Sequence, residues 1–202
     1  MGTGQYFEPS PRVSSRPSSV TLALGDVTLA LTTDRGVFAA DAVDAGTRFL
    51  LLDAPAPPAA GDVLDLGCGY GPIACTLARR APHATVWALD VNERALALCA
   101  ANAHANDIGN VRAVRPDEVP VTVRFAAIWS NPPIRIGKAA LHDLLSTWLA
   151  RLAPDGCAVL VVQRHLGADS LAAWLRGQGH AVDRVASRQG YRLLLVRPVP
   201  AP

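Results

Sequence analysis

Short apolar segments alternate with Ala- and Leu-rich segments of helical length along most of the chain. Short runs rich in Val, Leu and Ile are typical of buried strands, and longer segments with apolar residues three or four apart indicate helices. The predicted strands are 62–66, 84–90, 111–114, 125–130, 157–163, 180–186 and 191–197. The predicted helices are 71–80, 92–106, 138–152 and 168–178.

This alternation predicts an α/β fold in which helices cover both faces of a seven-stranded, mostly parallel sheet. The last two predicted strands differ from the rest because only the turn at 187–190 separates them. A parallel connection needs a crossover of about a dozen residues. The last strand is therefore expected to run antiparallel to its neighbour.

The N-terminal part follows a different pattern. A stretch rich in Pro, Ser and Arg, up to about Ser19, is typical of an extended arm. Apolar residues then alternate on both sides of Gly25-Asp26, which predicts a hairpin formed by 20–24 and 27–32.

A linker separates this N-terminal part from the alternating elements. A short helix is expected at 49–52, and three prolines within 54–60 indicate a linker. We therefore expect residues 1–53 to supply an arm, a hairpin and a short helix that pack on a main domain at 54–202.

Composition and charge narrow the function classes. The chain has 202 residues, of which 50% are hydrophobic and 18% charged, so it can bury a sizeable core and is not a disordered chain. Its 19 basic and 17 acidic residues give a net charge of +2. A protein that binds nucleic acid through bulk charge is usually more basic. Lys138 is the single lysine; the other basic residues are arginines.

Several kinds of site and location are not expected. The four cysteines form no Cys-x-x-Cys pair and the five histidines show no ligand spacing, which disfavours disulfides and a metal site. The start of the chain lacks the features of a secretory signal, and no apolar stretch approaches the ~20 residues of a membrane span. The expected location is the cytoplasm, without membrane contact.

A glycine-rich loop follows the first predicted strand of the main domain. Glycines alternate with other residues from Gly67 to Gly71, directly after Asp65 and before a helix. Dinucleotide-binding loops have G-x-G-x-x-G, and here Pro72 occupies the sixth position. Asp90 ends the next strand, where an acid binds ribose hydroxyls in such folds. This pair of acids fits a nucleoside that bears an amino acid. The simpler alternative is that the glycine loop is only a tight turn between strand and helix and binds no ligand. The acid at Asp90 makes this alternative less favoured.

A second motif, Asn131-Pro132-Pro133-Ile134, follows the fourth strand of this domain. Two prolines fix the backbone and remove two N–H donors, so the Asn131 side-chain oxygen and the Pro132 carbonyl are expected to be free acceptors. Two fixed acceptors can hold an exocyclic amine for reaction with an electrophile. Ile134 offers an apolar face to a base. A proline loop without chemistry is the alternative, and the glycine loop at the same sheet edge argues against it.

These motifs resemble those of class I S-adenosylmethionine-dependent methyltransferases. More narrowly, the chain is similar to the methyltransferase small domain group, which includes the bacterial 16S rRNA guanine-N2 methyltransferases. The resemblance extends from about Tyr6 to Tyr191. It is to the members of this group that have a single domain. It implies a Rossmann-like fold with S-adenosyl-L-methionine as cofactor. The segments that show it are 36–38, 44–48, 65–72, 90–95, 131–138 and 163–170.

The resemblance also implies roles for individual residues. The cofactor's methionine part would be held by Asp65, Gly67, Cys68, Gly69, Tyr70 and Gly71. Its ribose and adenine would be held by Asp90, Val91, Asn92 and Asp117. Phe38 and Thr47 would close over cofactor or target, and Asn131 would contact both. The target amine and its base would be held by Asn131, Pro132, Pro133 and Ile134, and further substrate contacts would come from Arg135, Lys138 and Arg164.

The resulting hypothesis is an N-methyltransferase that acts by in-line transfer on the exocyclic amine of a guanine in 16S rRNA. Its expected partner is rRNA or the small ribosomal subunit, and the protein is expected to be a monomer or a homodimer. Two alternatives are a protein glutamine N-methyltransferase and a cofactor-binding RNA assembly factor without transfer activity.

Overall fold

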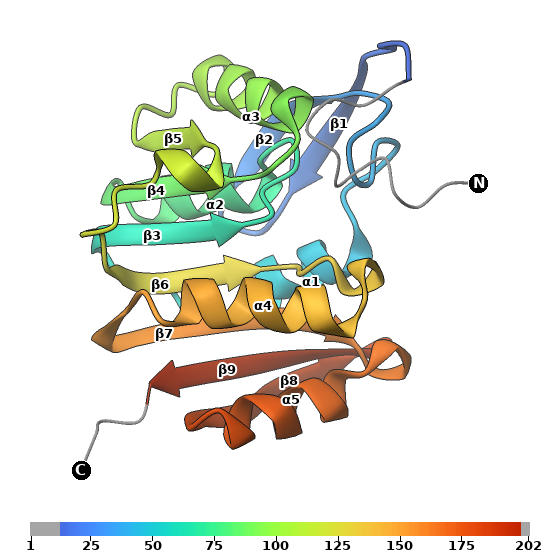
Figure 1. Cartoon of the computed structure of the whole chain (residues 1–202). Coiled ribbons are helices and arrows are strands. Elements are labelled where there is room, and N and C mark those ends of the chain that lie inside the picture. The colour runs from blue at the N-terminus through green and yellow to red at the C-terminus, as the bar shows by residue number, and fades with distance from the viewer. Residues whose placement is uncertain (1–12, 199–202) are drawn as a thin grey trace.

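The computed structural model describes residues 13–198 as a seven-stranded sheet with helices on both faces and an N-terminal hairpin (Figure 1). The strand order is β5-β4-β3-β6-β7-β9-β8. The strands are β3 (Ala60–Leu66), β4 (His83–Leu89), β5 (Val111–Val114), β6 (Phe125–Ser130), β7 (Leu152–Gln163), β8 (His180–Arg188) and β9 (Tyr191–Pro198). Within this sheet β9 runs against the others, since it pairs antiparallel with both β7 and β8.

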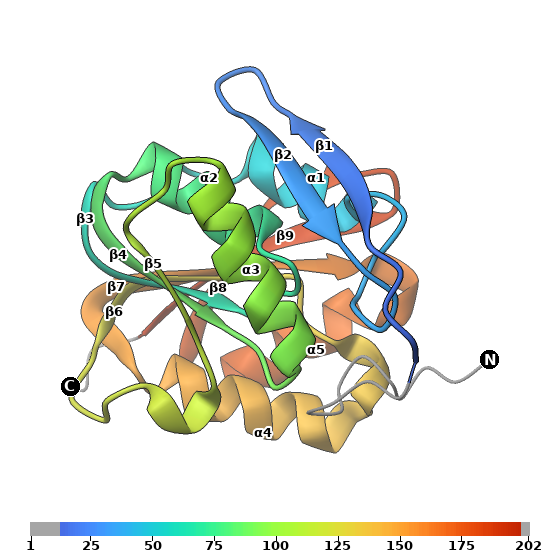
Figure 2. The same ribbon diagram turned by 90° about the horizontal axis from the view of Figure 1, so that it is seen from above.

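Two helical layers bury the sheet (Figure 2). One face packs against α1 (Ala45–Asp53), α2 (Pro72–Arg80) and α3 (Glu93–Ala105), together with the hairpin β1 (Ser18–Ala23) and β2 (Thr28–Thr33). The other face packs against α4 (Lys138–Leu149) and α5 (Ala168–Gly177). Burial on both faces explains why the central strands are almost continuously apolar. The predicted Rossmann-like fold with its antiparallel last strand is confirmed.

The predicted end of one helix and start of the next strand are wrong. The helix expected at 138–152 ends at Leu149, and β7 begins at Leu152 instead of residue 157. Leu152 pairs with Phe125 of β6, and the register then shifts before Cys157 pairs with Ala127. The helix is expected to end before Pro154, but the exposed Pro154 lies in this irregular stretch of β7 and interrupts a strand instead.

The helix expected at 49–52 is longer at its N-terminal end. Observed α1 spans Ala45–Asp53, because the Asp44 side chain accepts a hydrogen bond from the Thr47 N–H and caps the first turn. The region expected to be a linker connects α1 directly to β3. Most of the expected extended arm, residues 1–12, lies outside the described residues.

Asn102 of α3 and Asn106, which follows the helix as its C-cap, attach the hairpin to the main domain. The Asn102 side chain accepts from the Thr32 N–H and donates to the Thr32 carbonyl, and Asn106 pairs with both backbone groups of Ala30. These side chains complete the hydrogen bonding of β2 along its edge. The segment after β2 is thereby led to the edge where the parallel strands end.

Candidate functional site

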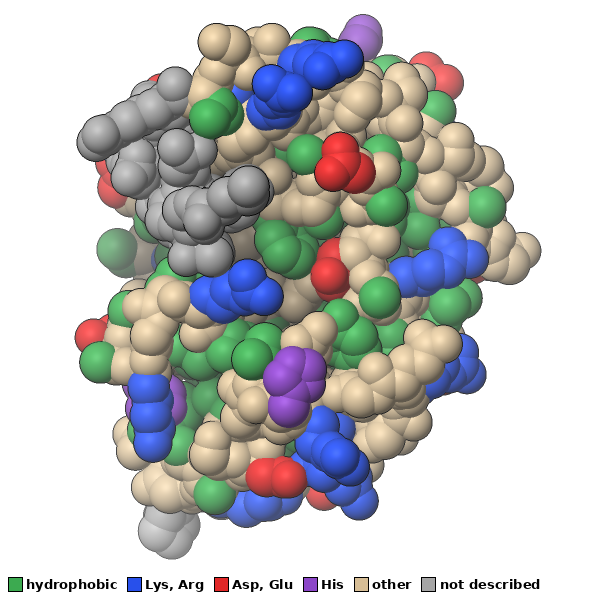
Figure 3. Space-filling view, turned by 90° about the vertical axis from the view of Figure 1, so that its right-hand side faces the viewer, with side chains coloured by type: hydrophobic (Ala, Val, Ile, Leu, Met, Phe, Trp, Pro, Cys, Tyr) green, Lys and Arg blue, Asp and Glu red, His purple; other side chains and the backbone are tan. Residues whose placement is uncertain are grey.

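A cavity of about 310 Å³ opens at the carboxyl ends of β3, β4, β6 and β7. Ligands of open α/β sheets bind at this edge. Figure 3 looks onto it and shows hydrophobic side chains in the middle of the face with basic side chains around them. Phe38, Val91 and Leu166 line the cavity although 46%, 39% and 37% of their surfaces are exposed, an apolar lining that is typical of a ligand site.

The glycine loop forms one wall of this cavity. Gly67 and Gly69 have φ angles of 82° and 54°, which other residues rarely adopt. A Cβ atom added at either position would meet no atom within 4 Å, so open space adjoins both backbones. The Gly69 N–H donates to Asp90 Oδ2 over 2.9 Å, which joins the loop after β3 to the end of β4.

Asp90 lines the cavity and is fixed by backbone donors. Its second oxygen accepts from the Asn92 N–H over 3.0 Å. Burial raises the pKa of the Asp90 carboxyl, and the N–H groups of Asn92, Gly69 and Val91 oppose this rise. A carboxylate in this position retains acceptor capacity for hydroxyl groups of a ligand.

Asn92 joins α3 to the segment that contains Phe38. Its side-chain oxygen accepts from the Arg94 N–H at the start of α3, and its side-chain nitrogen donates to the Gly36 carbonyl over 2.8 Å. The residue is fully buried, although it also borders the cavity. Asn92 therefore places the exposed Phe38 at the cavity entrance.

Two hydrogen bonds fix the side chain of Asn131 at the cavity. Its Nδ2 donates to Asp44 Oδ2 over 2.8 Å and to Thr47 Oγ1 over 3.0 Å. Both protons of the amide are used, so the amide oxygen is left as an acceptor. Asp44 itself caps α1 through the Thr47 N–H. The N-terminus of α1 thus sets the orientation of a side chain 87 residues away.

The two prolines after Asn131 form a tight turn. Pro133 has φ −75° and ψ 72°, close to the values of an inverse γ-turn. The Pro132 carbonyl accepts from the Ile134 N–H over 2.8 Å. The expectation that this carbonyl is free is therefore wrong in part, since one of its two lone pairs is engaged.

A smaller hollow of about 30 Å³ adjoins the cavity. Thr47, Cys68 and Tyr70 line it, and it shares Phe38 and Asn131 with the larger cavity. The Tyr70 hydroxyl is buried and has no hydrogen-bond partner among the described residues. Burial, followed by the charge of Asp44, raises the pKa of Tyr70 to about 12, so the phenol stays a neutral donor.

Comparison with known proteins agrees with this geometry. The family model of the methyltransferase small domain matches residues 28–195. The chain belongs to the methyltransferase small domain family. The predictions of an S-adenosylmethionine-dependent methyltransferase and of its cofactor are thereby confirmed.

Relatives of this family differ in length. YbxB of Bacillus subtilis (strain 168), described as uncharacterized, is 34% identical over 96% of this chain and 98% of its own length. Ribosomal RNA small subunit methyltransferase C of Shewanella sp. (strain W3-18-1) is 31% identical over 84% of this chain and 50% of that protein. The chain thus spans about half the length of the relatives with an assigned rRNA activity.

A solved structure shows the same fold. It is the 16S rRNA N2 G1207 methyltransferase RsmC of T. thermophilus in complex with AdoMet and guanosine. The TM-score is 0.78 at 23% identity, over 94% of this chain and 52% of that chain.

Most of the site residues expected from the sequence line the cavity or the smaller hollow. Those that line it are Phe38, Gly67, Gly69, Asp90, Val91, Asn92, Asn131, Pro132, Pro133, Ile134 and Arg135. Thr47, Cys68 and Tyr70 border the smaller hollow. Asp65, Gly71, Asp117, Lys138 and Arg164 line neither space.

Asp65 and Gly71 have structural roles in the described fold. Asp65 is fully buried, and its Oδ2 accepts from the Ala74 N–H in the first turn of α2, where Gly71 offers no capping side chain. Its Oδ1 has no partner among the described residues. A Cβ atom at Gly71 would lie 2.7 Å from Cys99 Sγ, so glycine is required for the packing of α2 on α3.

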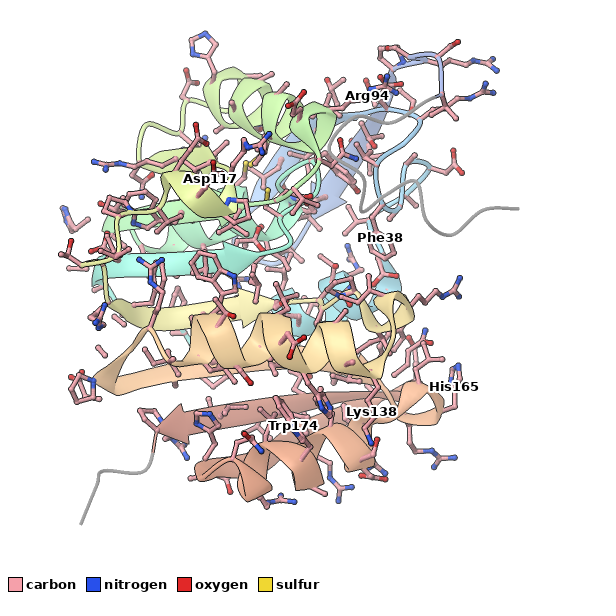
Figure 4. The ribbon with its side chains drawn as sticks, viewed as in Figure 1. Phe38, Arg94, Asp117, Lys138, His165 and Trp174 are labelled. Carbon is pink, nitrogen blue, oxygen red and sulfur yellow. The ribbon has the colours of Figure 1, made fainter. Side chains whose placement is uncertain are left out.

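The remaining predicted residues lie outside the cavity. Asp117 is exposed on the short helix η2 (Pro116–Glu118), where it pairs with Arg115, and Figure 4 shows it far from Phe38. Lys138 begins α4, and Arg164 begins the short helix η4 (Arg164–Leu166). Both are exposed, and Figure 4 places Lys138 near the edge at which the strands end.

Sequence reasoning missed several lining residues, among them Asp44, Gln163, Leu166 and Tyr191. Gln163 ends β7 and Tyr191 begins the antiparallel β9, so both meet the edge that Asn131 occupies. That position was the available signal. Asp44 and Gln163 also belong to the segments 44–48 and 163–170 that resemble the family. Among the described residues no group of three or more potential ligands could hold a metal ion, and no helix is long and apolar enough to cross a membrane.

Proposed function

We propose that this protein transfers a methyl group from S-adenosylmethionine to the exocyclic N2 amine of a guanine in 16S rRNA. The observation on which this rests is the amide of Asn131. Its nitrogen is held by Asp44 and Thr47, so its oxygen is presented as a fixed acceptor in the cavity. A fixed acceptor suits a donor such as an exocyclic amine.

The residues present fit the cofactor. Asp90 can accept the ribose hydroxyls, Val91 offers apolar surface to the adenine, and the open side of Gly67–Gly69 leaves room for the methionine part. The Tyr70 hydroxyl, which borders the smaller hollow without a partner among the described residues, is an unused donor. When bound, S-adenosylmethionine supplies an electrophilic methyl group on a sulfonium.

The protein contributes positioning and electrostatics. Asn131 Oδ1 and the remaining lone pair of the Pro132 carbonyl each accept one N–H of the target amine. These bonds favour the geometry in which the nitrogen lone pair points to the methyl group. The amine nitrogen would form a bond to the methyl carbon as the carbon–sulfur bond breaks, which leaves S-adenosyl-L-homocysteine as product, and the amine would release one proton to water. Ile134 and Phe38 would flank the base plane.

The substrate class is supported by relatives and not by this chain alone. The Shewanella relative is an rRNA small subunit methyltransferase, and the T. thermophilus protein acts on N2 of G1207 in 16S rRNA. Because this chain spans about half of each, rRNA or the small subunit as partner remains our proposal. Such an enzyme would work in the cytoplasm, where ribosomes are assembled.

Labelled methyl transfer tests this function. Purified 16S rRNA and 30S particles from a strain that lacks the protein are incubated with the enzyme and methyl-labelled S-adenosylmethionine, and the modified base is mapped. We expect label on N2 of one guanine. Label on a protein glutamine would contradict the proposal, as would cofactor binding without transfer to either substrate.

A further inference from the structure

Gln163 and Tyr191 form a hydrogen-bonded pair beside Asn131. Gln163 is the last residue of β7 and Tyr191 the first of β9, and the two are direct partners in the antiparallel register. Gln163 Nε2 donates to the Tyr191 hydroxyl oxygen over 2.7 Å. Both residues line the cavity that contains Asn131.

This hydrogen bond leaves one acceptor and one donor for a ligand. Because the Gln163 amide nitrogen donates, its Oε1 is available as an acceptor. Because the Tyr191 oxygen accepts, its own O–H proton is available as a donor. Neither group has another partner among the described residues.

The pair is positioned by the helix that also orients Asn131. A Cβ atom at Gly46 would lie 2.6 Å from Cε1 of Tyr191, so the tyrosine ring rests directly on the first turn of α1. Asp44, which caps the same turn, holds the Asn131 amide. Asn131, Gln163 and Tyr191 form a polar row. The short helix α1 therefore positions Asn131 and Tyr191, the two ends of this row.

The row follows the strand order. Strands β6, β7 and β9 are neighbours, about 4.8 Å apart. Asn131 directly follows β6, whose last residue pairs with Leu160, and the pair of Gln163 and Tyr191 lies farther along β7 and β9, so the three residues follow the strand order. The Watson–Crick edge of guanine presents its groups in a matching order: the N2 amine, the N1 proton and the O6 acceptor. A protein site that binds this edge must offer two acceptors followed by a donor.

We propose that Gln163 and Tyr191 select guanine at the target position. Gln163 Oε1 accepts the N1 proton, and the Tyr191 hydroxyl donates to O6, while Asn131 holds the N2 amine. Adenine is rejected because its unprotonated N1 would face the Gln163 oxygen, which leaves two acceptors opposed. This inference rests on the proposed function of the same cavity.

The test uses an RNA with either guanine or 2-aminopurine at the mapped position. 2-Aminopurine keeps the N2 amine but lacks the N1 proton and O6. We expect wild-type kcat/KM to be about a hundredfold or more higher for guanine. Gln163→Met and Tyr191→Phe should each lower kcat/KM for guanine about tenfold or more. Neither should lower the value for 2-aminopurine, and Gln163→Met should raise it because the opposed oxygen is gone, so the ratio shrinks.

The controls separate selection from folding. Gln178→Met changes an exposed glutamine at the far end of α5, and its guanine to 2-aminopurine ratio should equal that of the wild type. Cofactor affinity, measured by calorimetry, should be the same in all variants.

Two outcomes would overturn the inference for different reasons. If the variants lose the same factor in kcat/KM for guanine and for 2-aminopurine, the ratio is unchanged. The pair then does not select guanine, although the enzyme methylates it. No methylation of guanine by the wild type would overturn the proposed function, and this inference with it.

Discussion

At the scale of single residues, the carboxylate of Asp44 links the cap of α1 to the side chain of Asn131, the proposed acceptor for the target amine. One oxygen accepts from both the Thr47 N–H and the Asn131 side chain. An amide that could rotate would present either its oxygen or its nitrogen to the target. The Asp44 charge favours the nitrogen and so leaves the oxygen for the amine.

We expect Asn131→Ala to lower the rate of transfer about a hundredfold or more with little effect on cofactor affinity. The variant removes the fixed acceptor, and loss of one preorganised polar group in an active site typically lowers kcat by about a hundredfold or more. Single-turnover transfer measures the chemical step, and calorimetry measures binding of S-adenosylmethionine. Turnover like that of the wild type would contradict the assigned role.

We expect Asp44→Ala to lower kcat about ten- to a hundredfold, because a charge-assisted hydrogen bond contributes about 1.5–3 kcal/mol. Loss of the α1 cap should also lower the free energy of unfolding by about 1 kcal/mol. Asp44→Asn, which can still accept both hydrogen bonds, should recover part of kcat. Asp41→Ala, at an exposed position of the same segment, is the matched control and should change neither quantity.

Individual residues were predictable where a motif is local. Asn131 and Asp90 could be found because strand ends and prolines place them at the sheet edge. The positions of Asp44, Gln163 and Tyr191 left a signal in the sequence, but their roles could not be predicted, because these depend on hydrogen bonds across the fold. Asp65 remains a predicted cofactor contact, although the structure shows it bonded to α2.

At the scale of elements, local patterns predict strands and helices better than the places where they end. The strand β3 and helix α2 are recognisable because a buried apolar run is followed by glycines and a proline at the first helical turn. The predicted end of α4 is too late because Pro154 is, in the sequence, the signal that ends the helix. Pro154 lies instead in an irregular part of β7. Pairing with Phe125, which is a tertiary contact, decides that boundary.

The cap of α2 by Asp65 predicts a pH dependence of stability. Burial raises the pKa of this carboxyl well above its usual value of 3.8 in the folded state, the Ala74 N–H opposes the rise, and Asp90 adds to it. A raised folded-state pKa means that the residue's contribution to stability is complete below 3.8 and is lost as the pH rises through the folded-state pKa.

We therefore expect the free energy of unfolding of the wild type to decline relative to that of Asp65→Asn as the pH rises above 4, by about 1.4 kcal/mol for each unit of pKa elevation. Urea unfolding without cofactor at several pH values measures this difference. Asp155→Asn, at an exposed site, should follow the wild type at every pH. Parallel curves for wild type and Asp65→Asn would show that the raised pKa is absent.

At the scale of the whole molecule, the net charge of +2 is too small for attraction of RNA by bulk charge. Recognition must then depend on where the basic residues lie. Arg135 lines the cavity, and the exposed Lys138 and Arg164 are the first residues of α4 and η4. These three residues form the basic rim. We expect the basic rim to bind phosphates next to the target base.

Replacing the basic rim with glutamine should weaken RNA binding in a salt-dependent way. For each phosphate that is no longer neutralised by a basic side chain, the slope of log K against log salt falls by about 0.7–0.9, so three replaced residues correspond to a change of about two to three. Binding is measured from 50 to 200 mM salt, with the unfolding midpoint as a check on folding. The matched control replaces Arg112, Arg124 and Arg184, which are exposed and do not line the cavity. An equal change of slope in both triple variants would mean that RNA responds to total charge and not to the rim.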